Sequence, residues 1–317
     1  MKKKYLLFLF ITIIIGCEQT LNFDGELTES KLTVGALANP DTCLSLYLYK
    51  STFFLDDDLL SDEQFYSVQN AIVWLKTSDS IYYLRYNSNN HQYISDYKPL
   101  IGDRIEINAS KEGFEIIKGN TQIKSKSDFQ IVESITFYNE NPKKIMDDGF
   151  LHPIDNTGND TIIKIVCKIS DPSNENNYYR LNVRSIGSSK PAPLGYSDFA
   201  FANDIFASND ILFFDNSISK SIEGWPKHFS NVFDDRLFNG KSYIFTIESR
   251  QRNGLFNWIE IDLQHISYDF YKYLKSIELA KCSTNDIHSE PVKIYSNIEN
   301  GYGVFGSLTS NKYIIHF

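Results

Sequence analysis

The stretch Cys43-Leu-Ser-Leu-Tyr-Leu-Tyr49 carries the clearest structural signal in this chain. Its leucines at positions 44, 46 and 48 alternate with serine and tyrosine, which is the two-residue period of a strand with one buried face. Short strands separated by turn residues predict an antiparallel sandwich of immunoglobulin type over residues 30–128. The other strand-like runs of this region are residues 31–38, 71–76, 80–86, 104–109 and 115–117.

A second β-rich domain is predicted over residues 129–317. Its strongest strand is Thr-Ile-Ile-Lys-Ile-Val-Cys-Lys-Ile-Ser at residues 161–170, which Asp171-Pro172 ends. The remaining strands are expected at residues 177–183, at 243–248 with 257–263 as its partner, and at the C-terminal residues 312–317. The whole chain is therefore predicted to be mostly β.

One helix is predicted, over residues 267–281. Ser267 is a good N-cap, and Asp269 in the first turn complements the positive end of the helix dipole. Phe270, Leu274 and Ile277 recur at helical spacing and form one apolar face.

A long segment at residues 187–235 has no strand or helix pattern but is rich in aromatic and acidic residues. Unstructured loops of this length are uncommon unless they serve a function. Aromatic rings can stack on sugars or anchor a partner protein, or they can fill the core of the second domain. Both interpretations stay open, and the candidate binding surface consists of Tyr196, Phe199, Phe213, Phe214 and Trp225.

The N-terminus has the pattern of a lipoprotein signal. Three lysines at residues 2–4 precede the apolar residues 5–15, which are too few to span a bilayer. The order Ile14-Ile15-Gly16-Cys17 then resembles a lipobox, in which the cysteine sulfur receives a lipid. We expect a signal peptide at 1–16, lipidation of Cys17 and an acidic tether at 17–29; a plain signal peptide with an incidental cysteine is the alternative.

Charge and cysteine content limit the possible partners. The formal net charge is -9, which argues against nucleic acid, because phosphate binding needs clusters of lysine and arginine. Apart from Cys17 the chain has Cys43, Cys167 and Cys282, an odd number, so at most one disulfide can form. We expect all three to be buried thiols, and we expect no metal site and no cofactor.

No catalytic motif is found in the sequence. Gly301-Tyr-Gly-Val-Phe-Gly306 has the glycine spacing of a dinucleotide site, but no βαβ unit surrounds it. We expect a tight structural turn whose glycines allow positive φ angles and whose polar side chains bond nearby backbone. The residues of this candidate turn are Asn297, Asn300, Gly301, Gly303 and Gly306.

Several segments resemble a family of Bacteroidetes lipoproteins, the domain of unknown function 4249 family. The most specific is Ser-Glu-Pro-Val-Lys-Ile-Tyr-Ser-Asn-Ile-Glu-Asn-Gly-Tyr-Gly-Val-Phe-Gly at residues 289–306. Residues 31–41, 170–180, 237–243 and 266–274 also look similar to family segments. The resemblance implies an outer-membrane lipoprotein, exposed at the cell surface and often encoded beside a TonB-dependent receptor; it supplies no catalytic residues.

Three functions follow as expectations. The first is a non-catalytic accessory binding protein of a TonB-dependent nutrient importer, held at the outer membrane by its lipid, with an unknown ligand. The second is a structural or adhesive module of the envelope. The third, a hydrolase with a site assembled from scattered residues, has no motif in its favour.

Overall fold

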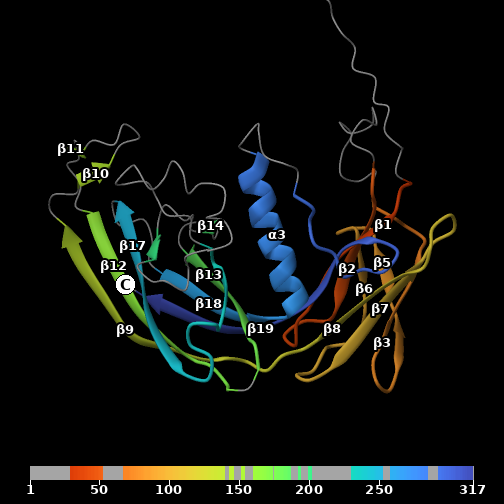
Figure 1. The fold of residues 1–317 in the computed structure, drawn as a ribbon, viewed down its shortest axis with the longest axis horizontal. Coiled ribbons are helices and arrows are strands. Elements are labelled where there is room, and N and C mark those ends of the chain that lie inside the picture. The colour runs from red at the N-terminus through yellow and green to blue at the C-terminus, as the bar shows by residue number, and fades with distance from the viewer. Residues whose placement is uncertain are drawn as a thin grey trace, which may run out of the picture.

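The computed structural model describes residues 29–52, 67–139, 143–145, 151–153, 160–173, 175–186, 192–193, 199–201, 230–252, 258–284 and 292–316. It confirms a mostly β fold with a sandwich at the N-terminal side, a second β-rich part, and one described helix near the C-terminus (Figure 1).

The first sandwich is built as the alternating leucines predict. Leu44, Leu46 and Leu48 are each 1% exposed and lie in the core between the two sheets. One sheet contains β1 (Leu32–Ala38), β2 (Ser45–Lys50), β6 (Gln92–Ile94) and β5 (Arg85–Asn87). The facing sheet has the order β4 (Ile81–Tyr83), β3 (Ile72–Lys76), β7 (Arg104–Ser110) and β8 (Ile117–Gln122).

The run at residues 80–86, predicted as one strand, is divided between the two sheets. β4 pairs with β3 in one sheet, and β5 pairs with β6 in the other. Leu84 lies between them, is 7% exposed and donates its N–H to the carbonyl of Val73 at 2.9 Å. A buried leucine at the crossing therefore turns one continuous stretch into a link between the sheets.

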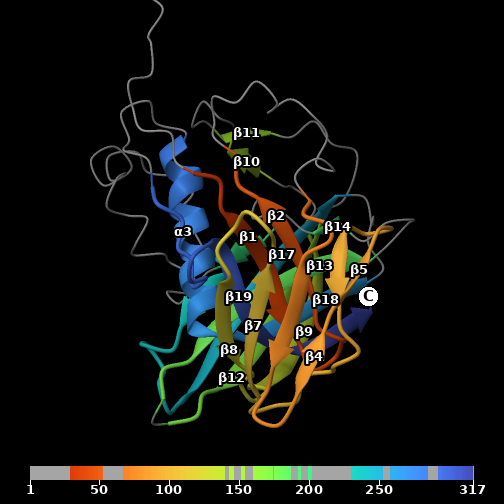
Figure 2. The ribbon, with the colours of Figure 1, turned by 90° about the vertical axis from the view of Figure 1, so that its right-hand side faces the viewer.

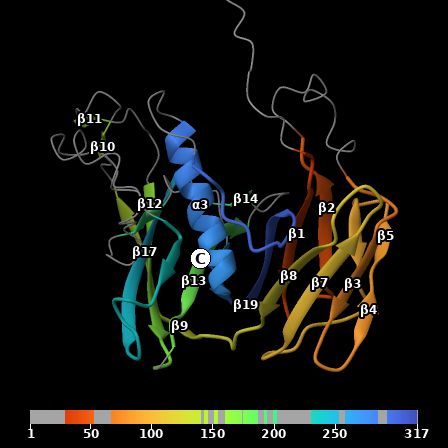
Figure 3. The same cartoon turned by 45° about the vertical axis from the view of Figure 1, so that its right-hand side comes forward.

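The last strand, β19 (Tyr302–His316), joins the two parts of the chain. Residues 302–307 pair in parallel with β1, and residues 308–316 pair antiparallel with β18 (Trp258–Ile266). One sheet thus runs from β14 (Ala192–Pro193) through β13 (Tyr178–Ile186), β18 and β19 to β1, β2, β6 and β5. Figure 3 shows β19 beside β1, so this sheet crosses the predicted domain boundary at residue 128.

The second part also packs two sheets around a core. β12 (Asp160–Ser170) pairs along its length with β9 (Asp128–Asn139) and β17 (Ser242–Arg252), and β15 (Phe199–Phe201) completes that sheet. The expected pairing of 243–248 with 257–263 is wrong: β17 and β18 lie in different sheets, because each finds its partners far away in the sequence. The short strands β10 (Lys143–Ile145) and β11 (Leu151–Pro153) pair with each other.

The predicted helix is α3 (Tyr268–Thr284), which lies between the two parts in Figure 1. Ser267 caps it, because its hydroxyl accepts the N–H of Phe270 at 3.4 Å and its carbonyl accepts the N–H of Tyr271 at 2.9 Å. Phe270 packs with Val304 and Leu308 of β19. Within the described part of the chain, no helix is both long and apolar enough to cross a membrane.

The cysteine predictions are partly wrong. Cys167 is buried in the core of the second part, where loss of hydration raises its thiol pKa to about 12. Cys43 is exposed, because it lies out of phase with the inward-facing leucines that follow it. Both thiols are free, and the side chain of Cys282 lies outside the described residues.

Candidate functional site

Most of the predicted binding surface falls outside the described residues. This applies to Tyr196, Phe213, Phe214 and Trp225, and also to Cys17. Phe199 begins β15, whose backbone pairs with β17.

At the end of the same segment, β16 (Val232–Asp234) pairs with β13. The ring of Phe233 is 4% exposed and lies 5.6 Å from that of Tyr179. Here, at least, an aromatic residue of the segment fills the core.

The polar residues of the predicted turn close the free edge of β8. Side chains of the C-terminal segment donate to carbonyls within β8 and just before it, and Glu299 forms a backbone bridge with Lys118 between them. An open strand edge is a site of unwanted pairing, and these bonds protect it. The donor–acceptor pairs are Asn300 with Ile116 at 3.1 Å, Asn297 with Asn120 at 3.2 Å, and Ser307 with Gln122 at 2.6 Å.

The same pattern continues along the connection between the two parts. Alternate side chains of β19 bind the backbone carbonyls of residues 125–129, which holds this connection against the strand. The pairs are Thr309 with Ser125 at 3.1 Å, Asn311 with Ser127 at 2.7 Å, and Tyr313 with Phe129 at 2.6 Å. Like Asn297 and Asn300 of the predicted turn, these side chains bind backbone far away in the sequence.

The glycines of this segment are required by close packing more than by backbone angle. Gly303 and Gly306 lie within β19, not in a turn, and a positive φ is found at Gly303 (99°) and Asn300 (59°). A Cβ atom on Gly303 would lie 1.9 Å from the carbonyl oxygen of Val34. The predicted positive φ is wrong for Gly301 and Gly306, where a Cβ would instead meet neighbouring atoms at 2.6 Å.

Two other segments that carry the family resemblance meet in a buried polar cluster. Tyr179 donates its hydroxyl to Asp171 at 2.6 Å, and the same carboxylate accepts the N–H of Gly240 at 3.0 Å. Asp235 accepts the N–H of Asn177 at 2.7 Å. Burial raises the pKa of Tyr179, and the Asp171 carboxylate adds to the effect. These residues fix the loops between strands, so their role is structural.

His265 lies beside this cluster and contacts the connection between the two parts. Its Nδ1 donates to the carbonyl of Ser125 at 2.8 Å, since a carbonyl can only accept, which assigns the tautomer. Its Nε2 is buried without a hydrogen-bond partner among the described residues. Burial is the main cause that lowers the pKa of His265, so the ring is held neutral.

A groove at the β8 edge is the best candidate for a ligand site. Its volume is about 610 Å³, and it lies between the sheet β4-β3-β7-β8 and the first residues of α3. Figure 2 shows α3 on the β8 side of that sheet. Small-molecule sites span about 300–1,000 Å³, so the groove has a suitable size. Polar and charged side chains dominate its lining: Lys76, Thr77, Ser78, Arg104, Glu106, Asn120, Thr121, Gln122, Lys124, Ser267, Tyr268 and Asp269, with Ile105.

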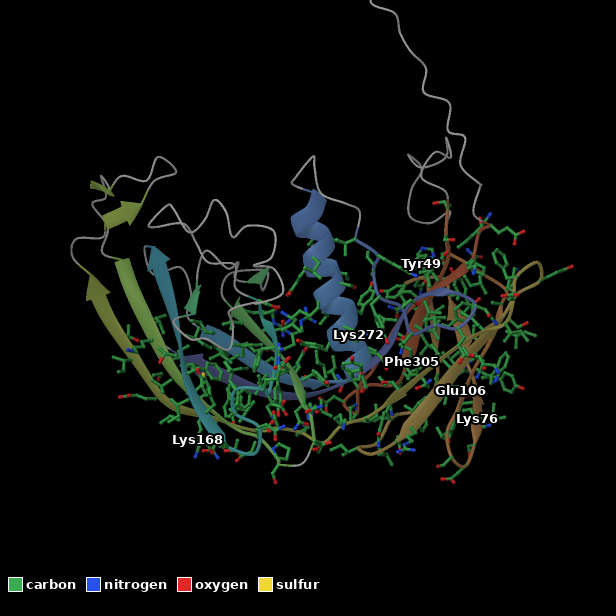
Figure 4. The ribbon with its side chains drawn as sticks, viewed as in Figure 1. Tyr49, Lys76, Glu106, Lys168, Lys272 and Phe305 are labelled. Carbon is green, nitrogen blue, oxygen red and sulfur yellow. The ribbon has the colours of Figure 1, made fainter. Side chains whose placement is uncertain are left out.

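Strand alternation places the charged residues of the groove on the solvent side of the sheet. Lys76 lies opposite Glu106 in the register of β3 and β7, and Arg104 lies opposite Gln122 in that of β7 and β8. Their neighbours in sequence face the core instead, such as Leu75 at 0% exposure. Figure 4 shows Lys76 and Glu106 close together on this sheet.

Three charged groups of the groove already have partners. Lys124 forms an ion pair with Glu175 at 2.8 Å, which lowers the pKa of Glu175. Asp269 accepts the hydroxyl of Tyr295 at 2.5 Å; burial, followed by this bond, raises the pKa of Tyr295 to about 12. Glu106 accepts the amide of Asn108 at 3.0 Å.

Two cations of the groove remain without such a partner. Within the described part of the chain, neither Lys76 nor Arg104 has a carboxylate within 4.0 Å. Sequence reasoning missed both residues, because they are isolated in sequence and belong to no motif. The one available signal was their outward position on the predicted strands 71–76 and 104–109.

Among the described residues, no group of three or more His, Cys, Asp or Glu side chains could hold a metal ion.

Comparison with known proteins supports the resemblance noted in the sequence. No curated protein matches the chain. The model of the family described as Domain of unknown function (DUF4249) matches residues 18–314. Because this match covers nearly the whole chain, the protein belongs to the DUF4249 family.

Proposed function

We propose that this protein is a lipid-anchored, non-catalytic binding protein of the outer membrane, which holds a small polar ligand for a TonB-dependent importer. The observation that carries the proposal is the groove of about 610 Å³ at the β8 edge, with two cations that have no carboxylate within 4.0 Å among the described residues. The lipobox ending at Cys17 supports the anchor, and the family resemblance supports the location and the importer.

The rigid connection between the two walls of the groove also favours a binding role. One wall comes from the first sandwich, while the other, Ser267 to Asp269, follows β18 of the second part. The side chains of β19 form hydrogen bonds with the segment that connects these parts, so the two walls are held in a fixed position relative to each other. A site that is already in its bound shape loses less entropy when the ligand enters.

The binding role is tested by uptake in cells whose chromosomal gene carries Lys76→Gln together with Arg104→Gln. Both side chains are exposed, so the variant is expected to fold normally, which its thermal unfolding checks. Slower growth on the limiting nutrient that the neighbouring importer takes up, with normal protein at the surface, supports the proposal. Uptake equal to wild type would argue against a role for the groove.

The anchor needs a separate test. Cys17→Ala is expected to abolish labelling by radioactive palmitate and to release the protein from the membrane fraction, because acyl chains supply the attachment. Unchanged fractionation with membranes would contradict lipid anchoring without bearing on the groove.

A structural or adhesive module is the second candidate, because one sheet runs without interruption from β14 to β5. Such a continuous sheet makes a stiff spacer. Deletion of residues 30–128 would not test this cleanly, since β19 would lose its partner β1. The paired groove variant separates the two functions: normal uptake combined with altered surface assembly would favour the structural role.

A further inference from the structure

We infer that the groove at the β8 edge binds an acidic saccharide, with Lys76 and Arg104 holding its carboxylate. This inference deepens the proposed function and rests on it. It names the class of ligand, which neither the family nor the sequence motifs indicate.

The charge distribution in the groove favours an anion. Lys76 and Arg104 flank the Glu106 position, since Lys76 lies opposite Glu106 and Arg104 lies two residues before it on β7. Residue positions related in this diagonal way are about 7–8 Å apart at the backbone. The long side chains of Lys76 and Arg104 can therefore both reach one carboxylate between them. Both cations lack a carboxylate within 4.0 Å among the described residues, although the whole chain has a net charge of -9.

The two carboxylates of the groove are engaged elsewhere. Glu106 accepts the amide of Asn108, which lies further along β7 on the side away from Arg104. Asp269 is bound by the hydroxyl of Tyr295. Both carboxylates keep their negative charge, but among the described residues neither lies within 4.0 Å of Lys76 or Arg104. An incoming carboxylate can therefore still form direct charge-assisted hydrogen bonds with the two cations.

The rest of the lining favours hydroxyl groups over apolar side chains. Ile105 is the aliphatic member of the described lining, while Asn120 and Gln122 project from alternate positions of β8. Side-chain amides both donate and accept, which matches sugar hydroxyls. Thr121, between these two residues, is 6% exposed and faces the core, so the side chains that β8 presents to the groove are the two amides.

The test is calorimetric titration of the full-length protein in detergent. The probes are oligosaccharides ending in galacturonate, glucuronate or sialic acid, each paired with its methyl ester, which keeps the hydroxyls and removes the charge. At least one acid is expected to bind about tenfold more tightly than its ester, equivalent to about 1.4 kcal/mol. Its affinity should fall as salt rises, because the cations are exposed.

Variants connect that binding to the groove. Lys76→Gln and Arg104→Gln are each expected to weaken the acid about tenfold and to leave the ester unchanged. Lys168→Gln is the matched control, since Lys168 lies on β12, far from the groove in Figure 4, and it should bind as wild type.

Each other outcome has a defined meaning. Equal binding of acid and ester, binding of an acidic peptide in place of every sugar, or insensitivity to both variants would overturn the acidic-saccharide inference and leave the proposed binding function intact. Failure of every acidic probe to bind at millimolar concentration would also overturn the inference. If, in addition, the paired variant supported normal uptake, the proposed function would fail as well.

Discussion

Asn297 offers the sharpest test of how the C-terminal segment holds the first sandwich. Its side chain pairs with the backbone of Phe305 as a neighbouring strand would: Nδ2 donates to the carbonyl at 2.9 Å, and Oδ1 accepts the N–H at 2.9 Å. Nδ2 also lies 3.2 Å from the carbonyl of Asn120 on β8. Because Phe305 is 0% exposed, water cannot easily replace these bonds.

Asn297→Ala should therefore be strongly destabilising. It leaves the N–H and the carbonyl of Phe305 without partners, and each buried unsatisfied group costs about 1–3 kcal/mol. We expect the free energy of unfolding to fall by about 2–6 kcal/mol, a large part of the stability of a typical domain. Asn297→Asp keeps the acceptor but places a carboxylate oxygen against the carbonyls of Phe305 and Asn120, so at neutral pH it should destabilise at least as much as Asn297→Ala.

Urea denaturation of the full-length protein, followed by tryptophan fluorescence and circular dichroism, measures this loss. Asn90→Ala is the matched control, since the side chain of Asn90 is exposed and, among the described residues, bonds only Gln92, at 3.1 Å. Its effect should stay within about 0.5 kcal/mol. A change below about 1 kcal/mol for Asn297→Ala would refute the argument that this amide replaces a strand.

Three more predictions concern backbone, pH and thiols. Gly303→Ala should prevent native folding, seen as protease sensitivity, because its Cβ would lie 1.9 Å from a backbone oxygen. Gly113→Ala, at φ 83° with open space around it, should cost only about 1–2 kcal/mol of backbone strain. Stability should fall as pH drops below about 6.5, because His265 takes up a proton in the unfolded chain but, with its lowered pKa, stays neutral when buried in the folded protein. Thermal unfolding across pH should show a smaller loss of stability on the acid side in His265→Asn, and an unchanged loss would contradict this. N-ethylmaleimide should label Cys43 in the native protein but Cys167 only after unfolding, as mass spectrometry would show; native labelling of Cys167 would disprove its burial.

The sequence by itself determined the local elements whose cause is local. The leucine alternation fixed β2, and Ser267 with the apolar spacing after it fixed α3 to within a few residues. The family could also be recognised, because its segments are continuous in the chain. Cys43 is exposed and not buried as predicted, because the phase of the strand outweighs the general preference of cysteine for the core.

Only the tertiary structure decided how these elements join. Nothing local in residues 302–316 shows that one half pairs with β1 and the other with β18, because strand pairing depends on edges that become available elsewhere in the fold. For the same reason Asn297 and Asn300 have the composition of turn residues, although their partners, in β8 and just before it, are more than a hundred residues away. The groove likewise exists only after β3, β7, β8 and α3 are assembled, since charges that are isolated in the chain become neighbours across strands.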